Sequence, residues 1–71
     1  MVVKTQVVLY IYDLLINGKE VEMEYILNKF NISIRTFRRY ISEINSFLCN
    51  NFKLEVVSYD KSKNIYVLKQ L

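Results

Sequence analysis

Residues 33 to 50 carry two opposed faces, and this segment constrains the fold more than any other part of the chain. When residues are placed at the helical interval of about 100° per step, large apolar side chains gather on one side: Phe37, Ile41, Ile44 and Leu48. Basic and polar side chains gather on nearly the opposite side: Arg35, Arg38, Arg39 and Ser42. The segment is therefore predicted to form one long helix with a buried apolar stripe and an outward basic strip.

A shorter helix and a tight turn are predicted immediately before this segment. Residues 22 to 30 carry apolar side chains at helical spacing, namely Met23, Ile26, Leu27 and Phe30. Asn31 follows, and asparagine tolerates the left-handed backbone conformation that a tight turn requires. Ser33 is a good N-cap, because its hydroxyl oxygen accepts hydrogen bonds from backbone N–H groups one turn further on. The pattern indicates two helices joined by a short turn.

The two ends of the chain complete an α+β arrangement that is mainly α. Residues 5 to 17 are predicted to form the first helix, and Gly18, the single glycine, follows where a left-handed C-cap is expected. Residues 19 to 21 form a link that can pair as a minor edge strand. Residues 54 to 59 and 65 to 69 are rich in β-forming side chains and flank a polar loop, which predicts a two-stranded hairpin.

Length and composition exclude several classes of protein. At 71 residues, the chain is expected to be one domain, 1–71. Cys49 is the only cysteine and there is no histidine, so neither an internal disulfide nor a zinc site is expected. Without a glycine-rich loop or a metal cluster, we expect no enzyme and no cofactor. The longest apolar run ends at Asp13, which is far too short for a membrane span, and the reducing cytoplasm is the expected location.

The basic strip matches what a helix needs to read DNA. A helix fits the major groove, and arginine is the commonest reader of guanine because its fork meets two acceptors of the base. The net charge of +3 favours an anionic partner, although a solvated basic face is the simpler alternative. Lys61 and Lys63 lie in the hairpin loop, where we expect contacts to DNA phosphates, and Lys4 is a weaker candidate for the same role.

Two motifs carry a resemblance to a known family. Residues 32–41 (ISIRTFRRYI) are similar to the V-S-x-R-T-I-x-R-D-I signature of winged helix-turn-helix regulators of the DeoR-like and related types. Residues 59–68 (YDKSKNIYVL) resemble the wing of the N-terminal domain in bacterial WYL-type regulators. The chain departs from the signature at Tyr40, where the usual residue is Asp, and at Leu27, where a small residue is common.

The resemblance implies a winged helix-turn-helix that binds specific duplex DNA to control transcription. Carried onto matching positions, Arg35, Thr36, Arg38 and Arg39 face the groove, and Ser33 caps the helix and touches a phosphate. Full-length relatives of both types carry a C-terminal sensor domain, which this chain is too short to include. The chain is expected to be either a small stand-alone regulator or the DNA-binding part of a longer one.

The chain has more apolar side chains than a single small core requires. With Val8, Ile11, Leu14 and Leu15 turned inward, Leu9 and Ile16 are expected at the surface. In the hairpin, alternation places one set inward (Val57, Tyr59, Tyr66, Leu68) and the other outward (Val56, Ile65, Val67). Such a surplus indicates a homodimer formed through the first helix or the wing edge, docking of a sensor domain, or a protein–protein interaction module that binds no DNA. Scattered surface apolar residues are also normal.

Overall fold

The computed structural model describes residues 3–51 and 53–71. Three helices, α1 (Lys4–Ile16), α2 (Met23–Phe30) and α3 (Ile34–Asn50), are followed by an antiparallel hairpin of β1 (Glu55–Asp60) and β2 (Ile65–Gln70). This order confirms the expected winged helix-turn-helix fold of class α+β, and each element lies within one residue of its predicted bounds.

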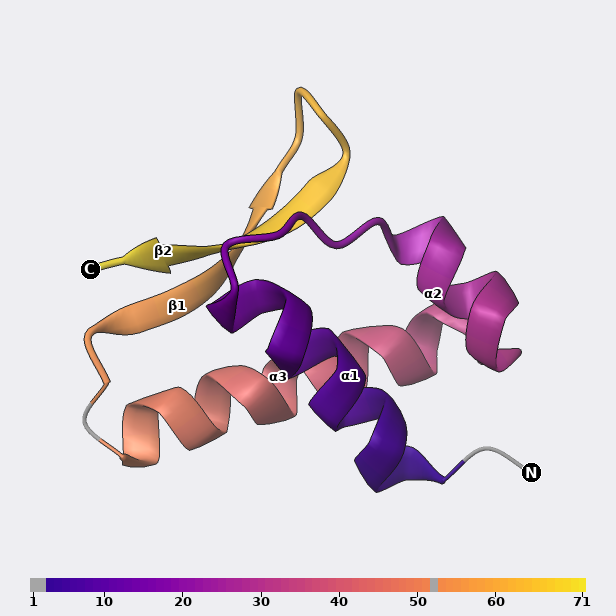
Figure 1. The fold of residues 1–71 in the computed structure, drawn as a ribbon, viewed down its shortest axis with the longest axis horizontal. Coiled ribbons are helices and arrows are strands. Elements are labelled where there is room, and N and C mark those ends of the chain that lie inside the picture. The colour runs from indigo at the N-terminus through magenta and orange to yellow at the C-terminus, as the bar shows by residue number, and fades with distance from the viewer. Residues whose placement is uncertain (1–2, 52) are drawn as a thin grey trace.

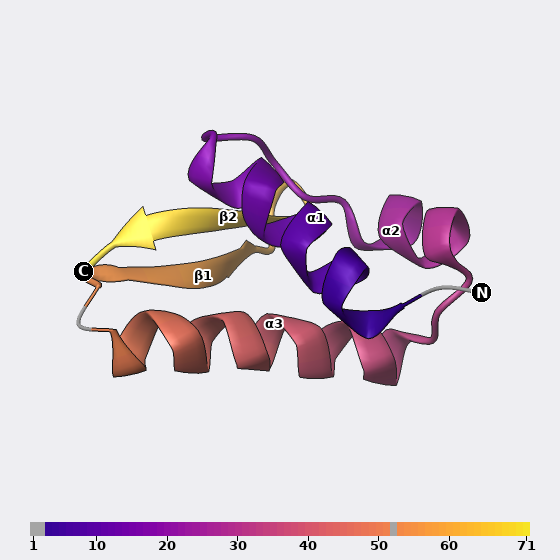
Figure 2. The ribbon, with the colours of Figure 1, turned by 60° about the horizontal axis from the view of Figure 1, so that its bottom comes forward.

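Helix α3 forms the base on which the other elements pack (Figure 2). Helix α1 crosses it, α2 lies near its first turns, and the hairpin lies over its C-terminal half. The tip of the hairpin projects away from the helices (Figure 1). One core cluster joins all these elements, and Phe37 of α3 and Ile11 of α1 are among its fully buried side chains.

Helix α1 is rotated slightly from the predicted setting. Its buried residues are Val7, Ile11 and Leu15, which follow one another at intervals of four residues. Val8 and Leu14, which were expected to face inward, are only half-buried. The exposure of Leu9 and Ile16 is confirmed.

Gly18 ends α1 in the left-handed conformation that the sequence predicts, with a φ of +73°. The backbone N–H of Gly18 donates to the carbonyl of Leu15 at 3.1 Å, and that of Lys19 donates to the carbonyl of Leu14 at 2.9 Å. These bonds satisfy carbonyls that have no partner within the helix. They turn the chain sharply into the link that leads to α2.

The turn between α2 and α3 also follows the sequence prediction. Asn31 is left-handed, with a φ of 53° and a ψ of 51°, and its N–H donates to the carbonyl of Leu27. Ser33 is the N-cap of α3, and its Oγ accepts from the backbone N–H of Thr36 at 3.1 Å. The angle between the two helices is therefore set by local hydrogen bonds as well as by the apolar contacts of Ile26 and Phe37.

The hairpin departs from the predicted faces at two positions. Tyr59 was expected in the core but is 47% exposed, because it lies near the outer end of the wing, where its ring packs on Tyr66 (centroids 5.0 Å apart). Ile65 was expected at the surface but is 6% exposed. The link pairs as an edge, as expected for residues 19 to 21. Val21 bridges to Tyr66, and this bridge brings the link between α1 and α2 against the start of β2. Ile65 is buried although it does not belong to the main core cluster.

Replacing Gly18 by alanine is expected to lower the free energy of unfolding through backbone strain alone. No atom lies within 4 Å of the position that a Cβ would take, so a steric clash contributes nothing. The left-handed conformation costs an L-residue about 1–2 kcal/mol, and chemical denaturation measures this loss. Gly18→Asn is the matched control and should lose less, because asparagine tolerates this conformation. Equal losses in the two variants would contradict the explanation.

Candidate nucleic-acid interface

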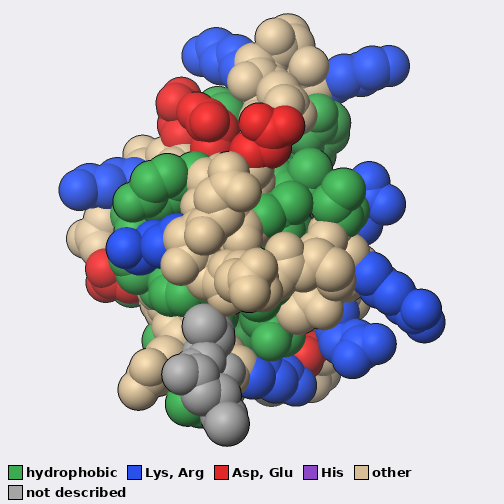
Figure 3. Space-filling model, turned by 90° about the vertical axis from the view of Figure 1, so that its right-hand side faces the viewer, with side chains coloured by type: hydrophobic (Ala, Val, Ile, Leu, Met, Phe, Trp, Pro, Cys, Tyr) green, Lys and Arg blue, Asp and Glu red, His purple; other side chains and the backbone are tan. Residues whose placement is uncertain are grey.

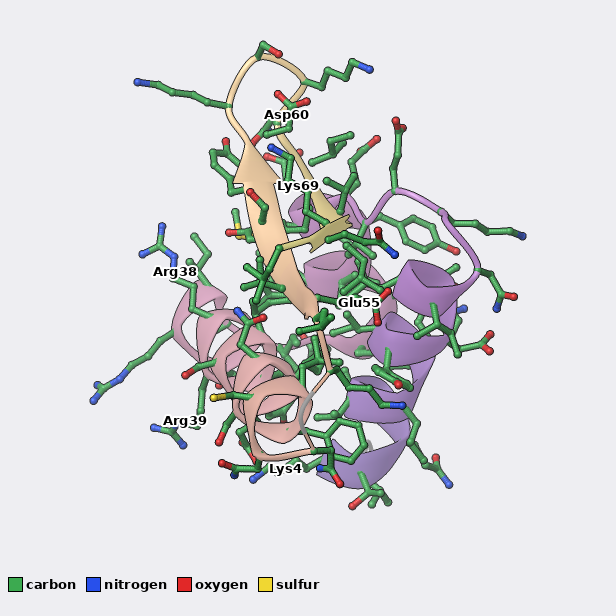
Figure 4. All side chains as sticks on the ribbon, turned by 90° about the vertical axis from the view of Figure 1, so that its left-hand side faces the viewer. Lys4, Arg38, Arg39, Glu55, Asp60 and Lys69 are labelled. Atoms are coloured by element: carbon green, nitrogen blue, oxygen red, sulfur yellow. The ribbon has the colours of Figure 1, made fainter. Side chains whose placement is uncertain are left out.

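The outward face of α3 presents the three arginines predicted from the sequence. Arg35, Arg38 and Arg39 are all exposed, as is Ser42 in the next turn. Figure 4 shows Arg38 and Arg39 extending from α3 into solvent. Within the described ranges, no arginine forms an ion pair with a carboxylate. Three guanidinium groups on one helix face are thus available to an anionic partner.

The opposite face of α3 explains why the arginines point outward. Phe37, Ile41, Ile44 and Leu48 are buried as predicted, and Tyr40 is buried with them at 8% exposure. The burial of Tyr40 was not foreseen from the sequence, although it lies three residues after Phe37 and four before Ile44, as a core position does. The wider buried stripe fixes the rotation of α3 about its own axis.

Ser33 and Thr36 are bound to each other at the start of α3. The Ser33 hydroxyl donates to Thr36 Oγ1 at 3.0 Å while its oxygen accepts the Thr36 backbone N–H. The capping role of Ser33 is confirmed, and Thr36 is half-buried beside the arginines. Both hydroxyls lie at the end of α3 that carries Arg35.

The wing tip is an ordered turn built on one carboxylate. Asp60 Oδ1 accepts from the backbone N–H of Ser62 at 3.0 Å, from the Ser62 hydroxyl at 2.7 Å and from the backbone N–H of Lys63 at 3.4 Å. Asn64 closes the turn in the left-handed conformation, with a φ of 55°. Such local bonds of aspartate are typical of turns. They fix the backbone between the two wing lysines.

The same bonds lower the pKa of the Asp60 carboxyl. The hydrogen bond from the Ser62 hydroxyl has the largest effect; partial desolvation opposes it, and the backbone N–H groups and the charge of Lys63 add to the lowering. Lys61 and Lys63 are both exposed at this tip. Basic side chains extend from opposite sides of the tip (Figure 3), so the wing offers positive charge on both of its faces.

Lys4, the weaker candidate for a phosphate contact, is engaged within the protein. Its Nζ lies 2.9 Å from Glu43 Oε2 on α3, and both side chains are about half-exposed. An exposed ion pair of this kind contributes at most about 1 kcal/mol, so a phosphate can compete for the lysine. The pair joins the start of α1 to α3 on the side of the basic strip that carries Arg39 (Figure 4).

A second cation is held among aromatic rings. Lys29 Nζ of α2 lies 5.4 Å from the ring centroid of Tyr10, 5.7 Å from that of Phe30 and 6.0 Å from that of Tyr25. Cations at such distances are attracted to the ring faces. The sequence pattern gave no indication of this site, because its members come from two helices.

An apolar hollow of about 250 Å³ lies between α1 and α3. It is lined by Val8, Leu9, Tyr12, Glu43, Ile44 and Phe47. Leu9 and Phe47 are 57% and 48% exposed. The surplus of apolar surface predicted for the first helix is therefore present on α1 and continues onto α3.

In the part of the chain that the structure describes, no three His, Cys, Asp or Glu side chains are grouped as a metal ion would require. No helix in residues 3–51 or 53–71 has both the length and the apolar character needed to cross a bilayer.

Comparison with known proteins identifies the type of domain. The model of the Mga helix-turn-helix domain family matches residues 1–67. This family therefore covers nearly the whole chain, whereas the local motifs had pointed to the DeoR-like and WYL-type regulators. A domain of this kind binds DNA in transcriptional regulation and is not an enzyme. No curated protein and no solved structure matches the chain significantly.

The replacement Ser62→Ala is expected to raise the pKa of Asp60 towards its ordinary value, because the largest cause of its lowering is then removed. In the native chain, the lowered pKa stabilises the folded state at every pH above the ordinary pKa of an aspartate carboxyl. This contribution is lost as the pH falls through the pKa of the folded state. A carboxyl titration by NMR measures the Asp60 pKa, and chemical denaturation at several pH values measures the change in stability. Ser58→Ala is the matched control on β1 and should leave the titration unchanged. An unaltered Asp60 pKa in Ser62→Ala would contradict the proposed cause.

Proposed function

Because the chain belongs to the Mga helix-turn-helix domain family, we propose that it binds specific sequences of double-stranded DNA with α3 in the major groove. The observation that carries this proposal is the strip of Arg35, Arg38 and Arg39, which is exposed, free of ion pairs within the described residues and held outward by the buried stripe behind it. A guanidinium fork can pair with guanine or with a phosphate, and neither use requires a change in the fold.

The remaining predicted contacts have supporting roles in this proposal. Ser42 lies within the arginine strip and Thr36 lies beside it, and both hydroxyls can accept or donate at base edges. Ser33 lies at the N-terminus of α3, where backbone N–H groups favour a phosphate. Lys61 and Lys63 of the wing contact the DNA backbone, which gives affinity and register but little sequence information. The roles of Thr36 and Ser33 follow the DeoR-like resemblance, whereas Ser42 is included because of its helical spacing and the two lysines because of their place in the hairpin loop.

The proposed setting is a bacterial cytoplasm, where the chain acts as a transcriptional regulator or as the DNA-binding unit of one that also carries a sensor domain. A homodimer formed through α1 or the wing edge would fit a palindromic operator. The exposed Leu9 and Phe47 beside the apolar hollow support an interface on α1.

A protein–protein interaction module that binds no DNA is the second candidate function. The apolar hollow between α1 and α3 favours it, because exposed apolar patches commonly mark interfaces. Under this alternative, the arginines serve only as a solvated face. Binding of a protein partner would then survive their removal.

The double variant Arg35→Ala/Arg38→Ala is expected to lose most of its affinity for DNA. Fluorescence anisotropy with random-sequence duplex at two salt concentrations measures this loss. Each phosphate contact removed should lower the log–log salt slope by about 0.9. Arg38→Ala or Arg39→Ala alone should reduce sequence preference, whereas Lys61→Ala should weaken binding to all sequences alike.

Lys19→Ala is the matched charge control for this experiment. Lys19 belongs to the link between α1 and α2, and this link runs on the far side of α1 from α3 (Figure 2). Its removal should leave both affinity and salt slope nearly unchanged. Equal losses in all lysine and arginine variants would indicate a general effect of net charge, and an absence of binding at low salt would favour the interaction module.

Sedimentation equilibrium tests the proposed homodimer. The wild-type chain is expected to associate at micromolar concentrations, and Leu9→Asp is expected to shift it to monomer because a charge then lies at the apolar interface. Leu54→Asp replaces an exposed leucine that lies outside the hollow and directly before β1, so it tests the wing edge as the alternative interface. A wild-type monomer at high micromolar concentration would exclude dimerisation by the chain itself.

A further inference from the structure

One side chain of α3 is hydrogen-bonded to the backbone of the wing. Asn45 Oδ1 accepts from the N–H of Val57 on β1 at 2.7 Å, and Asn45 Nδ2 lies 3.5 Å from the Val57 carbonyl oxygen as its donor. Asn45 is half-buried, and no helical pattern in the sequence singles it out. Among the described residues, no other side-chain hydrogen bond connects α3 with the hairpin.

The contact replaces a missing strand. In an antiparallel ladder, the N–H and C=O of one residue point to the same side. Those of Val57 point away from β2 and towards α3, because they meet Asn45. A primary amide offers one donor and one acceptor side by side, as a neighbouring strand would. Asn45 therefore satisfies backbone groups that would otherwise lie unpaired at a half-buried edge.

The contact between Asn45 and the wing lies beside the basic strip of α3. Asn45 and Arg38 are seven residues apart, so they lie on the same side of α3 at a separation of about 10 Å along its axis. The wing is thus attached along the flank of the basic strip that carries Arg38. The Val57 side chain is buried in the core, but apolar packing is non-directional and leaves the wing angle less defined than a hydrogen bond does.

We propose that Asn45 is a positioning residue that holds the wing at the angle at which its lysines and the α3 arginines reach one DNA duplex together. Asn45 itself does not contact the DNA in this arrangement. The inference rests on the proposed DNA-binding function, and it adds a residue that neither the motifs nor the charge pattern indicated.

The anchoring contact can be tested without DNA. Amide hydrogen exchange followed by NMR should show a protected Val57 N–H in the wild-type chain. In Asn45→Ala this exchange should become about tenfold faster, which corresponds to one lost hydrogen bond near the upper end of the usual range. Asn50→Ala, on the same helix and exposed, is the matched control. Unchanged protection of Val57 in Asn45→Ala would overturn the proposal.

A double-mutant cycle tests the positioning role. Asn45→Ala should weaken binding to random duplex and lower its salt slope, as Lys61→Ala/Lys63→Ala does. In the background that already lacks both lysines, Asn45→Ala should cause little further loss. A purely structural role, or a direct DNA contact by Asn45, predicts the same loss in both backgrounds, and that result would overturn the proposal.

A further variant keeps the outcomes distinct. Asn45→Asp keeps the acceptor for the Val57 N–H, so the Val57 protection should persist in a folded variant even if Asn45→Ala unfolds. The wild-type chain could bind no DNA while the Val57 N–H still loses its protection in Asn45→Ala. The proposed function and the positioning role would then both fail, and only the hydrogen bond between Asn45 and the wing would remain.

Discussion

The burial of one face of α3 is the constraint on which the rest of the structure depends. Phe37, Tyr40, Ile41, Ile44 and Leu48 all enter the core, and together they leave α3 a single rotational setting. Helices α1 and α2 and the strand β1 all pack against α3. The exposure of the arginines is a consequence of this packing, since they occupy the face that the core does not use. The core and the candidate interface are therefore two sides of one element.

The two flanks of the basic strip are held by different kinds of contact. On the Arg38 side, the neutral hydrogen bonds of Asn45 attach the wing. On the Arg39 side, the ion pair of Lys4 and Glu43 attaches the start of α1. Salt screens the exposed ion pair but has little effect on a neutral, half-buried hydrogen bond. The wing side of the interface is thus the one whose geometry should persist at the ionic strengths at which DNA binding weakens.

Asparagine occupies left-handed backbone positions that are often occupied by glycine. The chain has one glycine, at the end of α1, and it uses Asn31 between α2 and α3 and Asn64 in the wing tip for two further left-handed positions. Asn64 also accepts a hydrogen bond from the Tyr59 hydroxyl. The turns that place α3 and the wing lysines are consequently fixed by side-chain bonds as well as by backbone conformation.

The sequence by itself determined the order of the elements, the turns at Gly18 and Asn31, the Ser33 cap and the outward arginine strip. Each of these features depends on residues within about one or two helical turns of one another, where spacing and local chemistry decide the structure. The tertiary structure alone decided that Tyr59 is exposed and Ile65 enclosed, that Tyr40 joins the core and that Asn45 meets Val57. These features depend on how separate elements pack together, which the pattern within one element does not show. Periodicity tells which side of an element is apolar, but only the packed fold determines what that side meets.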